Sequence, residues 1–208
     1  MNATRTDSGS QSWLRSANCD GHYGAALLAV LSVLLGLCAA GERGREALRY
    51  QREALAHGQW WRLLSAHWVH LNLEHAVLNG AGLALLWMLL AREFSPRRWA
   101  WILLGSGIAI DAGLWFLRPA IDWYMGASGV LHGALAAGAV ALYRRGDGLG
   151  ATLLLLLVVK LIYEQHSGAS VFVGALPLVP DAHLFGALGG LAGALLSARV
   201  PQGSTKPV

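Results

Sequence analysis

The stretch Trp123-Tyr-Met-Gly-Ala-Ser-Gly-Val-Leu-His-Gly133 places a serine between glycines near the start of a long apolar run. Ser128 is open to close approach, because neither Gly126 nor Gly129 carries a Cβ atom that would cover it. If the run is helical, Ser128 and His132 lie on one face of the helix. A serine hydroxyl is a weak nucleophile without a general base. The stretch therefore predicts a nucleophile whose base comes from this helix or from a neighbouring one.

The composition is that of a membrane protein. Hydrophobic residues make up 55% of the 208 residues and charged residues 13%, about half of the share in a soluble domain. Most of six apolar runs approach the roughly 17–25 residues that cross a bilayer core. The runs cover residues 23–40, 68–90, 99–117, 125–143, 149–163 and 182–198. We predict an all-α membrane protein, a six-transmembrane-helix bundle over residues 23–199, with a cytoplasmic N-terminal tail over 1–22 and a C-terminal tail over 200–208.

Charge and cysteine content exclude several other classes. The net charge of +4 comes from residues scattered through loops, which favours helix-end anchoring at a lipid bilayer over nucleic-acid binding. Cys19 and Cys38 form neither a disulfide framework nor a metal motif, and we expect no metal and no cofactor. The first run could be read as a signal peptide, because Arg5 and Arg15 precede it. We expect it to remain as the first helix.

The distribution of arginine predicts how the helices cross the membrane. Arginines follow the second run at positions 92, 97 and 98, and the fourth run at positions 144 and 145, so these ends are expected in the cytoplasm. With six spans, both termini are then cytoplasmic, and the second, fourth and sixth helices enter from outside. His75, Ser128 and His183 consequently fall at a similar shallow depth below the outer surface.

The second run carries polar side chains that are costly in a membrane unless they face the inside of a bundle. His75 and Asn79 are four residues apart and converge on one helical face, which favours a functional role over packing. His70 lies five residues before His75 and is expected to point elsewhere, closer to Glu74. Asp111 in the third run is expected to be an internal hydrogen-bonding group rather than a catalyst.

Glycine pairs spaced four residues apart mark the fourth and sixth runs. They are Gly129 with Gly133, Gly186 with Gly190, and Gly189 with Gly193. Such stripes let helix backbones approach closely in membranes. If these two helices pack together, Ser128 and His183 can meet. General helix packing explains the glycines equally well, but it does not explain a serine and a histidine at their outer ends.

Taken together, these features resemble the rhomboid intramembrane serine proteases, over roughly residues 58–199. The residues that carry the resemblance are Trp61-Arg62, His75-x3-Asn79, Gly126-Ala-Ser128-Gly, and Ala182-His183 with Gly186 and Gly190. The resemblance implies that Ser128 is the nucleophile and His183 its general base, a dyad without an aspartate. It also implies an oxyanion hole made by His75, Asn79 and the backbone N–H of Ser128. Gly126, Gly129, His132 and Gly186 would support this site, beneath a cap formed by residues 164–180.

One departure points to a branch of the family. Many rhomboids place an aromatic residue four positions after the serine, where this chain has His132. The form Ser-Gly-Val-Leu-His-Gly and the compact length look like the rhombosortase branch, whose members are thought to remove C-terminal Gly-Gly, helix and basic-end sorting signals. The resemblance then implies a multi-pass protein of the bacterial inner membrane, with its site open to the periplasm. Its substrate would be a membrane-anchored protein, and the acyl-enzyme would pass to water or, as in a transpeptidase, to an amine.

Other assignments stay open from the residues alone. His132 is a rival base for Ser128, although a serine and a histidine on one helix usually point in parallel. A catalytically inactive rhomboid-like protein that binds transmembrane segments is the alternative function. A metal site from His67, His70, Glu74 and His75 lacks the His-Glu-x-x-His pattern, and no inverted repeat supports a channel. The oligomeric state is not indicated.

Overall fold

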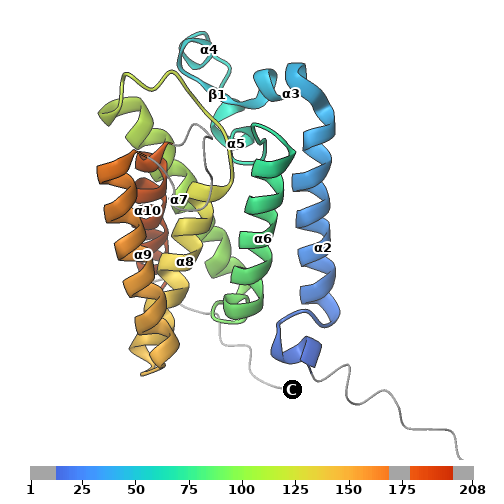
Figure 1. The fold of residues 1–208 in the computed structure, drawn as a ribbon, viewed down its shortest axis with the longest axis vertical. Coiled ribbons are helices and arrows are strands. Elements are labelled where there is room, and N and C mark those ends of the chain that lie inside the picture. The colour runs from blue at the N-terminus through green and yellow to red at the C-terminus, as the bar shows by residue number, and fades with distance from the viewer. Residues whose placement is uncertain (1–12, 169–178, 199–208) are drawn as a thin grey trace, which may run out of the picture.

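The computed structural model describes residues 13–168 and 179–198, and its long helices stand side by side as a bundle (Figure 1). These helices are α2 (Gly21–Gly36), α6 (Leu73–Leu90), α7 (Pro96–Ala112), α8 (Ser128–Arg144), α9 (Gly148–Ser167) and α10 (Pro180–Ala198). A π-helical turn, η2 (Gly113–Leu117), continues α7, and a 3-10 turn, η1 (Leu37–Ala40), joins α2 to α3 (Gly41–Leu48). Each of the six apolar runs thus coincides with one long helix.

Within the described part of the chain, four helical segments are long and apolar enough to cross a membrane. They are Gly21–Leu48, Leu73–Leu90, Pro96–Leu117 and Gly148–Ser167. Large apolar side chains of α9, including Leu155, Leu156 and Val159, are exposed on the outside of the bundle. Only lipid makes such a surface favourable, because water would be ordered around it.

Helix α8 lies inside the bundle and packs closely against α10. Its buried face is made of small residues, including Gly133, Ala136 and Ala137. A Cβ atom added at Gly186 of α10 would collide with the backbone of Gly129, and one added at Gly190 would collide with the backbone of Gly133. Because only glycine permits this approach, the two backbones are in direct contact, as the glycine pattern predicted.

Several helix boundaries differ from the ends of the apolar runs, and two of these differences matter for the site. The second apolar run begins at residue 68, but α6 begins at Leu73, because Asn72 caps it by accepting a hydrogen bond from the N–H of His75 at 2.8 Å. Residues 66–72 are therefore a loop. The fifth run was expected to end at residue 163, but α9 continues to Ser167 and so includes Glu164. At the other end of the expected cap, Pro180 already belongs to α10, and residues 169–178 lie outside the described residues.

The segment between α3 and α6 folds over one end of the bundle, at the top of Figure 1. It contains β1 (Tyr50–Gln51), α4 (Arg52–Ala56) and α5 (Arg62–Ser65). Strand β1 pairs antiparallel with β2 (Trp123–Tyr124), which leads into α8, with Tyr50 opposite Tyr124. The Arg62 guanidinium donates to the carbonyl of Arg49 at 2.8 Å and ties α5 to this layer. The segment thereby fixes the start of α8.

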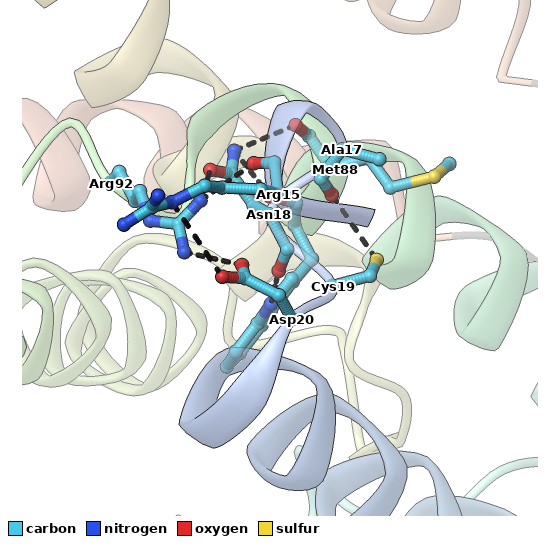
Figure 2. Close-up of polar contacts among 8 residues, drawn as sticks. Arg15, Ala17, Asn18, Cys19, Asp20, Met88 and Arg92 are labelled. Atoms are coloured by element: carbon cyan, nitrogen blue, oxygen red, sulfur yellow. Dashed lines mark hydrogen bonds and ion pairs between the residues drawn. The ribbon is translucent and has the colours of Figure 1, made fainter. Parts of the chain in front are cut away.

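Residues 13–20, part of the expected N-terminal tail, are docked on the opposite end of the bundle, at the bottom of Figure 1, through the polar contacts that Figure 2 shows. The Asn18 side chain donates to the carbonyl of Met88 at 2.7 Å. Arg92 donates to the carbonyl of Arg15 at 2.7 Å and pairs with Asp20. The hydrogen bond from the Arg92 guanidinium holds the pKa of the Asp20 carboxyl below its usual value. This part of the tail is anchored to the end of α6.

Candidate active site

Ser128 is the first residue of α8 and comes two residues after Gly126, whose backbone is in a conformation that favours glycine. Gly126 has a φ of +127°, and a Cβ atom there would lie 2.9 Å from Cε1 of the His75 ring. Its N–H donates to the carbonyl of Ala66 at 2.9 Å, and its carbonyl accepts from the Tyr124 hydroxyl at 2.8 Å. Only glycine fits both the backbone and the space, so Gly126 brings the His75 ring close to the serine.

The structure brings Ser128 and His183 together across the contact of α8 with α10. His183 Nε2 lies 2.9 Å from Ser128 Oγ, and the His183 side chain is buried. Its Nδ1 lies 2.7 Å from a carboxylate oxygen of Glu164. A carboxylate only accepts, so Nδ1 carries the proton and Nε2 accepts from the serine hydroxyl. This is the geometry of a nucleophile next to its general base.

Glu164 is a site residue that the sequence-based prediction missed. Its side chain is 0% exposed and projects from α9, although it was expected in the cap segment. Besides His183, it accepts from Lys160 Nζ at 2.5 Å. A signal was present in the sequence, because a Lys and a Glu four residues apart in an apolar helix must be paired. The expected dyad is thus part of a larger polar group.

His132, the rival base for Ser128, stacks on His183 instead of contacting the Ser128 hydroxyl. The His132 and His183 rings lie 4.2 Å apart between centroids and are inclined by 11°. His132 Nδ1 donates to the Ser128 carbonyl at 2.7 Å, and its Nε2 accepts from Lys160 Nζ at 2.9 Å. Both ring nitrogens are therefore engaged, and neither is bonded to Ser128 Oγ.

His75 and Asn79, which were expected in the oxyanion hole, lie in the first two turns of α6, and the His75 ring lies next to Gly126, two residues before Ser128. The N–H of Leu71 donates to His75 Nδ1 at 3.4 Å, so the proton of this ring is on Nε2, the atom that faces Gly126. Asn79 is buried, and its amide nitrogen donates to the carbonyl of His75 at 2.9 Å, its one acceptor within residues 13–168 and 179–198, which leaves the second N–H available. The N–H of Ser128 lies in the first turn of α8, where helices leave such donors unpaired.

His70 was expected to point away from His75, closer to Glu74, but its ring contacts both His75 and the residue before Ser128. Its side chain is 1% exposed, and its Nε2 accepts from the N–H of Ala127 at 3.4 Å. The ring contacts His75 edge-on, with 5.1 Å between centroids. Burial, together with the neighbouring His75, lowers the pKa of His70 to about 4, so the ring is neutral at neutral pH. The error arose because residues 68–72 were read as helix, although Asn72 is a typical N-cap residue.

The alternative metal site does not form from the residues considered in the sequence. Glu74 is exposed, and His67 Nε2 instead lies 3.5 Å from Asp111 Oδ1. Neither of these two atoms has a hydrogen-bond partner within the described residues, so the hydrogen-bonding role of Asp111 stays a prediction. Ligand atoms of His132, Glu164 and His183 do lie within 4.8 Å of one another. The Lys160 ammonium, however, donates hydrogen bonds to both His132 and Glu164, so a cation of the protein already occupies the lone pairs that a metal ion would need.

Comparisons with known proteins agree on one family. Residues 57–199 match the family of the rhomboid domain, which is more than half of the chain. The chain is also similar to YdcA of Bacillus subtilis (strain 168), a protein provisionally named a rhomboid protease. The two are 27% identical over 145 residues, which cover 65% of this chain and 66% of YdcA, slightly under two thirds of that relative.

Proposed function

The chain belongs to the rhomboid family and is a multi-pass membrane protein, and from that premise we propose that it is an intramembrane serine protease. The observation that carries the proposal is the 2.9 Å contact between Ser128 Oγ and His183 Nε2, made between two helices whose backbones touch. An inactive binder of transmembrane segments, the alternative function, has no need for a serine bonded to a correctly protonated histidine.

Acyl transfer at this site follows from the positions of the protons. Ser128 Oγ attacks the carbonyl carbon of the scissile peptide bond while His183 Nε2 takes the hydroxyl proton. The tetrahedral intermediate collapses, the C–N bond breaks, and the imidazolium gives its proton to the departing amine. Water or a second amine then attacks the ester, His183 takes its proton, and Ser128 leaves with that proton restored.

The negative charge that develops on the carbonyl oxygen needs donors that are already in place. We assign this role to the N–H of Ser128, to Nε2–H of His75 and to the free N–H of the Asn79 amide. His70 supports them, because its neutral ring holds the Ala127 N–H and packs against His75. Gly126 and Gly129 support the site by close packing, because the space that a Cβ atom would need is filled by the His75 ring at Gly126 and by the Ala182 carbonyl and Ile110 at Gly129.

We place all six long helices across the bacterial inner membrane, with the site open to the periplasm. Arginines 92, 97, 98, 144 and 145 lie at the ends of α6 and α8 and the start of α7, and residues 13–20 dock at the end of α6. This is the end that we assign to the cytoplasm. Arginines lie at the opposite end too, but Arg52 and Arg62 donate to backbone carbonyls there and Arg118 pairs with Asp181. Ser128 and His183 are in the first turns of α8 and α10, at the opposite ends of those helices.

For the substrate, we propose a membrane-anchored protein with a C-terminal Gly-Gly-type sorting signal. The support is His132, which occupies the place of an aromatic residue in many rhomboids and stacks on His183. Mass spectrometry of the new C-terminus on a processed substrate separates hydrolysis from transfer to an amine, because transfer adds the mass of the amine.

The direct test is cleavage of such a tethered substrate in membranes by Ser128→Ala and His183→Ala variants. We expect cleavage to fall by at least about 10³-fold in each variant, because the nucleophile or its base is gone. Ser95→Ala and His22→Ala, two exposed positions away from the site, are the matched controls and should cleave as the wild type does. Undiminished cleavage in either site variant contradicts the proposal. A wild-type protein that does not cleave the substrate favours the alternative function, an inactive protein that binds transmembrane segments.

A further inference from the structure

We propose that Glu164 is a positioning residue for His183, which turns the Ser-His pair into a Ser128–His183–Glu164 triad with Lys160 as its counter-ion. The inference rests on the proposed protease function and deepens it. The family resemblance implied a dyad alone, so the carboxylate comes from the geometry of this chain.

The side chains form a closed ring of hydrogen bonds that begins and ends at Ser128. The Ser128 hydroxyl lies 2.9 Å from Nε2 of His183, and Nδ1 of His183 lies 2.7 Å from Glu164 Oε2. Glu164 Oε1 in turn lies 2.5 Å from Lys160 Nζ. Lys160 Nζ also lies 2.9 Å from Nε2 of His132, and Nδ1 of His132 lies 2.7 Å from the Ser128 carbonyl, which closes the ring. Helices α8, α9 and α10 all contribute to it, so the contact is not a local pair within one helix.

The chemistry of the five groups allows one arrangement of protons. Glu164 only accepts and Lys160 only donates, so the former receives Nδ1–H of His183 and the latter donates to Nε2 of His132. His132 then has its proton on Nδ1, where the Ser128 carbonyl accepts it. His183 has a free lone pair on Nε2, the form that a general base requires.

Charge balance explains how a carboxylate is tolerated at this depth. An isolated charge inside a membrane bundle is costly, and a charge that loses its partner is strongly destabilising. The Lys160 ammonium balances Glu164, and its own side chain is 22% exposed. The resting ring is therefore neutral overall, with a neutral imidazole facing the serine.

The carboxylate acts on the reaction in two ways. It fixes the His183 ring in the tautomer that can take the serine proton, and it stabilises the imidazolium that forms when the proton moves. Both effects operate in the acylation step and change substrate binding little. Loss of the carboxylate should accordingly lower kcat much more than it raises KM.

Glu164→Gln tests the inference in the full-length protein. The glutamine side chain keeps the size but has one acceptor oxygen for two donors, His183 and Lys160. At one of these two contacts, the amide NH₂ group therefore faces another N–H group, and no hydrogen bond can form. We expect kcat to fall by about 10²–10⁴-fold with KM within about threefold, and the rate of Ser128 labelling by a fluorophosphonate to fall in parallel. Glu93→Gln is the matched control, because Glu93 pairs with Arg145 at 2.6 Å away from the site and should keep full activity.

Glu164→Asp keeps the charge and serves as the second variant if the glutamine variant does not fold. The shorter side chain withdraws from Nδ1, and we expect kcat between those of the wild type and Glu164→Gln. A folded Glu164→Gln or Glu164→Asp with the kcat and labelling rate of the wild type overturns the inference and leaves the proposed function intact. A wild type that neither cleaves nor labels at Ser128 refutes the proposed function itself.

Discussion

At the scale of the residue, His75 is the proposed oxyanion donor whose role can be tested most directly. Its ring lies against Gly126 with Nδ1 occupied by the Leu71 N–H, which leaves Nε2–H for a developing oxyanion. Replacing His75 by Ala removes that donor and should reduce kcat by about 10²–10³-fold. The measurement is steady-state cleavage in detergent, with thermal unfolding followed in parallel.

The neighbouring exposed Glu74, changed to Ala, is the control for His75→Ala and should leave kcat unchanged. If His75→Ala retains at least half of the wild-type kcat, the oxyanion assignment is wrong. If kcat falls only together with the unfolding temperature, the histidine is a packing residue instead.

The residue scale also shows what the sequence could and could not predict about the site. Ser128, His183, His75 and Asn79 could be proposed as site residues because each belongs to a short motif that resembles the rhomboid pattern. Glu164 was missed because its only local signal is Lys160, four positions earlier, and its partner His183 comes from another helix. A contact between two helices depends on how the helices pack, and residue spacing within one segment does not predict that packing.

At the scale of the element, the contact between α8 and α10 holds the serine and the histidine together. A Cβ atom at Gly186 would collide with the Gly129 backbone, which cannot move as a flexible side chain can. We expect Gly186→Ala to push the helices apart, to lower the unfolding temperature and to reduce kcat by at least about tenfold, since small misplacements are costly in catalysis.

Gly82→Ala on α6 is the matched control for Gly186→Ala. A Cβ atom there would meet Leu131 Cδ1 at 3.6 Å, an ordinary contact, and alanine favours the helix over glycine by about 1 kcal/mol. This variant should be as stable as the wild type or more so, with unchanged kcat. Wild-type stability and activity in Gly186→Ala would show that the close contact is not needed.

Helix positions followed from the apolar runs, whereas helix ends depended on capping and tertiary contacts. The side chain of Asn72 starts α6 five residues after the apolar run begins, and α9 continues past its apolar run because Lys160 and Glu164 are paired inside the bundle. The pattern of hydrophobic residues alone predicts neither of these helix ends.

At the scale of the whole molecule, composition predicted a helical membrane protein, but not the contacts that close its two ends. The β1–β2 pairing joins Tyr50 to Tyr124, and Asn18 reaches Met88, so each contact connects segments about 70 residues apart. Such pairings are short and have no periodic pattern. They nevertheless fix the start of α8 at one end and the N-terminal segment at the other.

The whole account depends on Ser128 being a hydroxyl made reactive by His183 inside an intact membrane bundle. A fluorophosphonate probe applied to membranes, followed by peptide mass spectrometry, measures that property without a known substrate. We predict an adduct on Ser128 that is unaffected by a metal chelator and is lost in His183→Ala, while His22→Ala labels normally. An unlabelled Ser128 in the wild type, or equal labelling in His183→Ala, would contradict it.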